Sequence, residues 1–217
     1  LVAASITMYI LCFRSKELSL RIDTGRFLPT WGVVKRALHI SLPMGLQQTI
    51  MCSAYVMTTI IIAPLGTFAI AANSFGVIVE SLCYMPGYGI ADAATTLVGQ
   101  SIGAGRHELM KRFAWLSVGL GVTVMAVMGV VMYVGAPVAM AMMTPAEEVR
   151  RLGVEVLRIE AFAEPMFAAA IVSYGVFVGA AKTLVPSIMN LVSIWGVRIS
   201  LAALLAPSMG LRGVWIA

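Results

Sequence analysis

The sequence predicts an all-α, polytopic membrane protein, and composition is the first reason. Hydrophobic residues make up 60% of the 217 residues, charged residues only 12%, and the mean hydropathy is +0.93. An average soluble domain is about half apolar and about a quarter charged. The distribution of charged residues along the chain is the second reason, because Glu80 and Asp92 are the only charged side chains between residues 37 and 105. Since lipid offers no hydrogen-bond partners to backbone N–H and C=O groups, such segments should cross the membrane as helices.

Five apolar segments are long enough to span a bilayer, which takes about 20 residues. They are residues 40–63, 68–96, 113–134, 161–181 and 183–207. Turn-forming residues separate them, namely Pro64 and Gly66, Gly103 and Gly105, Gly135 and Pro137 with Pro145 further on, and Pro207 and Gly210. Residues 1–13 resemble the end of one more transmembrane helix, and residues 211–217 the start of another. We therefore expect a chain truncated at both ends, with a linker at 14–39 and one transmembrane lobe at 40–217.

Basic residues predict the orientation, because Lys and Arg are retained on the cytoplasmic side. The 14–39 linker carries Arg14, Lys16, Arg21, Arg26, Lys35 and Arg36. The turn after Pro64 carries none, and the following turn carries Arg106, Lys111 and Arg112. The linker should therefore be cytoplasmic, with alternating sides after it. Arg150 and Arg151 fall in a stretch predicted to lie outside and weaken the rule there.

The sequence contains no pattern of a catalytic site, a metal site or a cofactor site. Cys12, Cys52 and Cys83 occur singly in apolar segments, and the two histidines lie at basic loop ends without neighbouring ligands. The net charge of +5 is spread over short loop clusters, whereas a nucleic-acid partner requires a dense basic face. We expect a non-enzymatic protein whose partners are membrane lipids and a small-molecule substrate.

Glu80 is the most informative residue, because it lies about twelve residues into its apolar segment and, at about 1.5 Å per residue, close to the bilayer midplane. A carboxylate costs at least a few kcal/mol there. Asn73 and Tyr84 share its helical face, so this polar stripe should face protein or water. Pro86 follows and should loosen the helix beside the acid. We interpret Glu80 as a candidate for cation coupling, with a neutral structural acid as the alternative.

A second acidic face lies on the 161–181 segment. Glu160 and Glu164 are one turn apart, and Phe167 and Tyr174 continue the face. Glu160 should lie at the outer water boundary. Glu164 should lie inside the apolar region, where it must be protonated, paired or water-facing. It is the second coupling candidate.

Other polar residues inside the spans are consistent with hydrogen bonding between helices. Asp92 lies beside Thr95 and Thr96. We expect it to bond to its surroundings, with cation coupling as the alternative. Gln47, Gln48 and Asn190 are expected to form hydrogen bonds between helices. The GxxxG spacings at residues 99–103 and 175–179 predict close helix packing.

Four short motifs carry a resemblance to a known family. They are Leu42-Pro-Met-Gly-Leu46, Ala93-Ala-Thr-Thr-Leu-Val-Gly-Gln-Ser-Ile-Gly-Ala-Gly105, Trp195-Gly-Val-Arg198 and Gly210-Leu-Arg-Gly-Val-Trp215. From about residue 33 to residue 217, the chain resembles the second six-helix lobe of the twelve-helix multidrug and toxic compound extrusion (MATE) transporters of the MOP superfamily. The resemblance implies two lobes around a cleft, alternating access, and export of organic cations driven by a sodium or proton gradient. The missing N-terminal lobe of the same polypeptide is then the expected partner.

Three departures limit what the resemblance implies. Some members carry a glutamate where Met51 stands and an aspartate where Phe167 stands, and their Gly-Ala-Gly-Asp-Thr run reads here as Gly179-Ala-Ala-Lys-Thr183. Their cation site is therefore absent, which leaves Glu80 as the best acid in this lobe, unless the essential acid lies in the first lobe. The candidate residues of the substrate cleft are Gln47, Met51, Asn73, Tyr84, Phe167 and Tyr174.

The leading hypothesis is a sodium- or proton-coupled antiporter that exports drugs or organic cations across a prokaryotic inner membrane. A lipid-linked oligosaccharide flippase of the same superfamily is the first alternative, but its cleft should be richer in Arg and Lys than these spans. A non-transporting membrane anchor or receptor is the second alternative, and it has no evident use for a midplane acid.

The charge pattern predicts that Gly66 and Arg106 lie on opposite sides of the membrane. In the full-length polypeptide without its native cysteines, Gly66→Cys and Arg106→Cys should react with an impermeant maleimide from opposite faces, the latter from the cytoplasm. Labelling of both positions from the same side would contradict the predicted alternation.

Overall fold

The computed structural model describes residues 5–7, 10–11 and 30–217, except for the side chains of Arg36 and Ile40. The chain divides into two compact units, Leu1–His39 and Ile40–Ala217. Within the first unit, residues 5–7, 10–11 and those from Trp31 onward are helical. Most of the predicted helix end at 1–13 and most of the 14–39 linker lie outside the described residues, including Cys12, Arg14, Lys16, Arg21 and Arg26.

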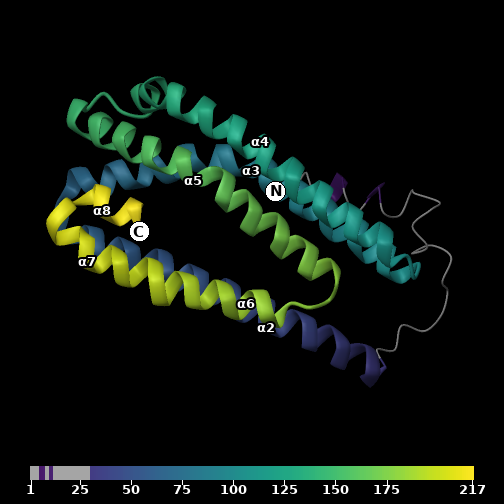
Figure 1. Ribbon diagram of the computed structural model, residues 1–217. Coiled ribbons are helices and arrows are strands. Elements are labelled where there is room, and N and C mark those ends of the chain that lie inside the picture. Colours follow the sequence, from purple (N-terminus) through teal and green to yellow (C-terminus); the bar gives the residue numbers. More distant parts are fainter. Residues whose placement is uncertain (1–4, 8–9, 12–29) are drawn as a thin grey trace. The chain divides into compact units, whose positions relative to one another are not determined.

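The described residues form helices and no strand, which confirms the all-α prediction (Figure 1). The elements are α2 (Trp31–Ile62), the short 3-10 helix η2 (Ala63–Leu65), α3 (Thr67–Gly103), α4 (His107–Met143), α5 (Glu147–Gly179), α6 (Leu184–Leu191), the π-helical segment η3 (Val192–Arg198), α7 (Ile199–Met209) and α8 (Leu211–Ile216). In the part of the chain that the structure describes, five spans are long and apolar enough to cross a membrane, namely α2 with η2, α3, α4, α5, and the continuous α6–η3–α7. The chain is a polytopic membrane protein.

The predicted break at Gly135 and Pro137 is wrong, because α4 continues through both residues to Met143. A proline inside a helix removes one backbone hydrogen bond, and membrane helices tolerate this loss when neighbouring helices cover the site. The break instead comes at Thr144 and Pro145. There the Thr144 hydroxyl accepts a hydrogen bond from the Ala146 N–H at 3.2 Å.

Two other helices begin earlier than the apolar segments predict. α5 begins at Glu147, where Glu147 and Glu148 occupy the first turn and their negative charges complement the positive end of the helix. The earlier start places Glu160 inside the helix, where it is half-buried, and its position at the outer water boundary stays a prediction. α2 begins at Trp31, within the predicted linker.

Helices α3, α4 and α5 pack together as one group (Figure 1). A Cβ added to Gly175 or Gly179 of α5 would lie 2.5 Å from the backbone carbonyl oxygen of Ala91 or Thr95 of α3. The Thr95 hydroxyl also donates a hydrogen bond to the Gly175 carbonyl at 2.8 Å. These contacts confirm close packing at the 175–179 spacing. In the 99–103 spacing, an added Cβ at Gly103 would meet no atom within 4 Å.

The short helix α8 is held against α3 and α5 by two polar contacts. The Trp215 indole N–H donates a hydrogen bond to Asn73 Oδ1 of α3 at 3.0 Å. The Arg212 Nε donates to Glu155 Oε2 of α5 at 2.8 Å, and this carboxylate forms an ion pair with the same guanidinium. The Asn73 side chain thus takes part in a contact between helices.

The α3–α5 contact predicts that Gly175→Ala destabilises the protein, by roughly 1–3 kcal/mol as for other overpacked sites, because its Cβ would press on a backbone carbonyl. The matched control is Gly135→Ala in α4, where an added Cβ meets nothing within 4 Å. Thermal unfolding of the detergent-solubilised full-length protein measures both. Equal melting temperatures for the two variants would contradict the close α3–α5 packing.

Candidate functional site

Three carboxyl groups from two helices interact electrostatically, and we call them the acid cluster. Among the described residues, no three acidic, histidine or cysteine side chains are placed to hold a metal ion. Glu80 belongs to α3, and Glu160 and Glu164 lie one turn apart on α5. Glu160 and Glu164 both act electrostatically on Glu80, and Glu160 acts on Glu164. The structure therefore brings together the two acidic faces predicted from the sequence. Three negative charges in an apolar bundle repel one another strongly, so the cluster requires protons or other cations to neutralise it.

Glu164 is the most deeply buried of the three, with 1% of its surface exposed. Neither of its carboxyl oxygens has a hydrogen-bond partner among the described residues. The residue lies against α4, since a Cβ added to Gly129 would be 3.4 Å from the Glu164 Cβ, and it acts electrostatically on Cys83 of α3. Of the three states predicted for Glu164, neither an ion pair nor exposure to water is observed.

Arg198 is a site residue that the sequence-based list of candidates omits. It is the last residue of the π-helical segment η3, and its charge acts on Glu80, Glu160 and Tyr55. The signal that could have identified it is the one used for Glu80, a charged residue deep inside an apolar run. Four helical elements, α2, α3, α5 and η3, thus contribute ionisable groups to one region.

Aromatic rings lie next to the acid cluster. Tyr84 follows Glu80 by one turn on α3, and its ring makes edge contacts with Tyr88 at 5.5 Å and with Phe167 of α5 at 6.1 Å between centroids. The predicted cleft residues Tyr84 and Phe167 therefore meet. Tyr174, one of the other predicted cleft residues, is half-buried on α5.

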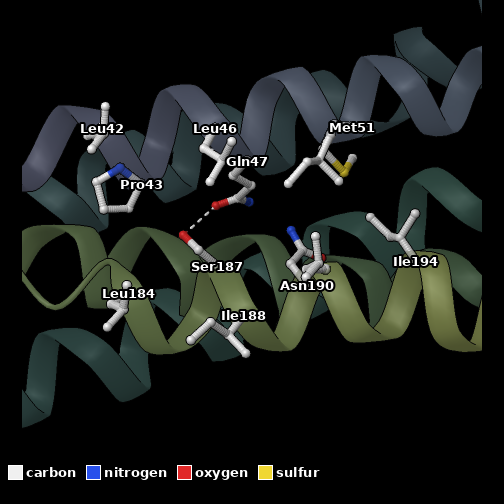
Figure 2. A pocket seen from close by; sticks show the side chains of 12 residues that line it. Leu42, Pro43, Leu46, Gln47, Met51, Leu184, Ser187, Ile188, Asn190 and Ile194 are labelled. Carbon is white, nitrogen blue, oxygen red and sulfur yellow. Dashed lines mark hydrogen bonds between the residues drawn. The ribbon is translucent and has the colours of Figure 1, made fainter.

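A pocket of about 280 Å³ lies between α2 and the α6–η3 segment (Figure 2). Its lining is apolar except for Gln47, Ser187 and Asn190. The Ser187 hydroxyl donates a hydrogen bond to Gln47 Oε1 at 2.7 Å, which confirms that Gln47 bonds between helices. Met51 and Ile194 lie together at one end of the pocket, as Figure 2 shows. Two predicted cleft residues, Gln47 and Met51, therefore share this pocket.

Among the described residues, the Asp92 carboxyl group has no hydrogen-bond partner, so the structure does not show the predicted bonding of Asp92 to its surroundings. The Thr96 hydroxyl donates to the backbone carbonyl of Asp92, and the Thr95 hydroxyl donates to the backbone carbonyls of Ala91 and Gly175. These hydroxyls satisfy helix carbonyls on the α3 surface, and Asp92 is exposed.

Comparison with known proteins identifies the family. The MatE family model matches residues 43–204, which is most of the chain. The chain belongs to the MatE family. It is 29% identical over 191 residues to a probable multidrug resistance protein NorM from Xylella fastidiosa, an alignment covering 87% of this chain and 41% of the relative. The predicted resemblance to MATE transporters is therefore confirmed.

Solved structures support the same fold. A crystal structure of MATE in complex with MaL6 has a TM-score of 0.87 at 18% identity and matches 98% of this chain and 49% of its own. A MOP superfamily transporter from Pyrococcus furiosus has a TM-score of 0.75 at 18% identity and matches 83% of this chain and 40% of its own. This MatE chain thus spans about half the length of the relatives it matches.

The geometry of Glu164 makes a prediction about stability. Since both carboxyl oxygens are buried without a partner, Glu164→Met should leave the stability of the full-length MatE protein unchanged or raise it, by about 1–3 kcal/mol. Glu155→Met is the matched control, because it breaks the Arg212 ion pair on the same helix and should lower the melting temperature. A lower melting temperature for Glu164→Met would mean that this carboxyl group has a partner in the intact protein.

Proposed function

We propose that this chain is the second lobe of a sodium- or proton-coupled antiporter that exports drugs or organic cations by alternating access. A first lobe in the same polypeptide would form the opposite wall of the cleft, with the 14–39 linker joining the lobes on the cytoplasmic side of a prokaryotic inner membrane. Two findings support this proposal. The matched relatives are about twice as long as this chain, and they are named probable multidrug resistance proteins.

The acid cluster is the observation that carries the proposal. Glu80, Glu160 and Glu164 interact within the spans, and Glu164 has no hydrogen bond among the described residues. Burying a carboxylate inside a membrane costs free energy, and acids that are found there commonly exchange protons or cations. Such an acid is therefore a functional candidate. Ion binding at the cluster would stabilise one orientation of the cleft, and ion release would stabilise the other. Glu80 is the coupling carboxylate in this proposal, because it is only half-buried and so remains accessible.

The surroundings of the cluster fit a cationic, partly apolar substrate. The Tyr84 and Phe167 rings lie one turn from Glu80 and from Glu164, respectively, and aromatic faces attract organic cations. The pocket beside α2 adds an apolar surface with the amides of Gln47 and Asn190. These features combine apolar lining with a few polar groups, as small-molecule sites commonly do.

The flippase alternative requires basic residues for anionic headgroups, and within the five spans the basic residues away from the helix starts are Arg158 and Arg198. Arg158 stacks over the Tyr133 ring at 5.1 Å. Arg198 is exposed and acts electrostatically on Glu80 and Glu160. The excess of carboxyl groups in this region favours a cationic substrate.

The proposal predicts that Glu80→Gln abolishes or uncouples gradient-driven efflux, because the amide keeps the shape of the side chain but cannot change its charge. Efflux of a cationic dye from proteoliposomes of the full-length protein is measured under an imposed proton gradient and, separately, a sodium gradient. Substrate binding and expression should remain close to those of the wild type.

The control for this experiment is Glu147→Gln, which removes an exposed carboxylate at the start of α5 and should transport normally. Full efflux by Glu80→Gln, with an unchanged dependence on the ion gradient, would reject the coupling role of Glu80. Glu160→Gln and Glu164→Gln would then show whether another acid of the cluster carries that role.

A further inference from the structure

The pocket between α2 and the α6–η3 segment has a length that matches one leaflet of a bilayer. It extends from Leu42 to Met51 along α2 and from Leu184 to Ile194 along α6 and η3 (Figure 2). About ten residues of helix cover about 15 Å, and the hydrocarbon core of a bilayer is about 30 Å thick. Leu42 and Leu184 stand at the start of the apolar segments 40–63 and 183–207. The pocket therefore corresponds to one half of the hydrocarbon core, from its surface to about its midplane.

The two helices that form the pocket leave much of their surface uncovered within the described chain. In the spans of α2 and of α6–η3–α7, 11% of the most apolar stretch is buried, compared with 28%, 22% and 28% in α3, α4 and α5. Leu46 and Ile188 line the pocket and are nevertheless more than half exposed. At the opposite end, Ile62 of α2 and Ala206 of α7 are buried in one core with α8. The two helices are thus held together at one end, and the pocket opens at the other.

A basic residue stands beside the surface end of the pocket. Lys182 comes two residues before Leu184, and its side chain is exposed. The turn that carries it is closed by Ala181, which has a φ of 56°, and by the Lys182 N–H, which donates to the Phe177 carbonyl at 2.9 Å. In the part of the chain that the structure describes, Lys182 forms no ion pair within 4.0 Å. Its ammonium group is therefore available to an anion at this surface.

The polarity of this region matches that of a phospholipid. Apolar side chains make up most of the pocket lining, no charged side chain is among them, and the positive charge lies just beyond one end. An acyl chain is apolar over the depth of one leaflet, and the phosphate of an anionic lipid lies at the surface, where basic residues attract it. An organic cation would find no acid in the lining of this pocket. The charge distribution thus favours an anionic lipid over a cationic substrate as the occupant.

We propose that the pocket between α2 and α6 binds one acyl chain of an anionic phospholipid, whose headgroup is held by Lys182 on the predicted cytoplasmic side. The acyl chain fills the space between the two helices. It thereby adds to the Ser187–Gln47 hydrogen bond in holding α2 against α6. The inference does not depend on the coupling role of the acid cluster, and its test measures lipid binding without transport.

The test uses the purified full-length protein in phosphatidylcholine nanodiscs. The probe is phosphatidylglycerol with a photoreactive diazirine in the middle of one acyl chain, and phosphatidylcholine with the same chain is the neutral probe. After illumination, mass spectrometry compares adducts on the pocket residues Leu46 and Ile188 with adducts on Leu116, an exposed residue of α4. Phosphatidylglycerol should label the pocket about fivefold more strongly than phosphatidylcholine, which is the factor that one basic residue contributes at a membrane surface. Both probes should label Leu116 equally.

Two variants test the two parts of the site. Lys182→Gln should abolish the preference for phosphatidylglycerol, whereas Lys182→Arg should retain it. Lys111→Gln is the matched control, because it removes an exposed lysine from the other predicted cytoplasmic turn. Asn190→Trp places a large ring in the pocket and should reduce pocket labelling by both probes severalfold. Its control is Leu120→Trp, at an exposed position of α4 outside the pocket. Thermal unfolding checks that each variant is folded.

Three results would overturn the inference. Adducts on Leu116 without adducts on the pocket would mean that another part of the full-length protein covers the pocket. Equal labelling of the pocket by both probes, unchanged in Lys182→Gln, would remove the anionic headgroup from the proposal. Unchanged pocket labelling in a folded Asn190→Trp variant would show that the acyl chain lies outside the pocket.

Discussion

The close approach of α3 and α5 determines where the acid cluster lies. Gly175 and Gly179 let the α5 backbone reach the carbonyl oxygens of Ala91 and Thr95, and small residues at such contacts fix the register of two membrane helices. Glu80 on α3 and the two acids on α5 face a common region because this register is fixed. Any side chain at these glycines would push the helices apart and would also separate the carboxyl groups. The packing of α3 against α5 therefore determines how close the carboxyl groups of the two helices lie.

Three carboxyl groups in an apolar bundle create a charge that must be balanced. Protonation or a bound cation can balance such a charge. The Arg212–Glu155 pair is balanced in another way, because the two side chains are in direct contact.

Much of the fold could be predicted from the sequence, because each membrane helix must satisfy its own backbone and therefore needs a long apolar run. The break at Pro137 could not, since whether a proline ends a membrane helix depends on its neighbours. Glu80 and Glu164 are visible as acids in apolar runs, but their convergence depends on the α3–α5 contact, which no single segment contains. Arg198 is likewise a charged residue inside an apolar run. It is harder to identify as a candidate, because the orientation rule leads one to expect basic residues in loops.

The π-helical segment changes the direction of the side chains part-way along one span. Before it, Ser187 and Asn190 of α6 line the pocket shared with α2; at its end stands Arg198, whose side chain is exposed. A wider helical turn changes the direction of every side chain that follows it. A continuous α-helix would therefore point Arg198 in another direction relative to Asn190. The weaker backbone bonding is partly offset by the Ser200 hydroxyl, which donates to the Trp195 carbonyl at 3.4 Å. The π-helical segment thus sets the direction in which the one charged side chain of this span projects.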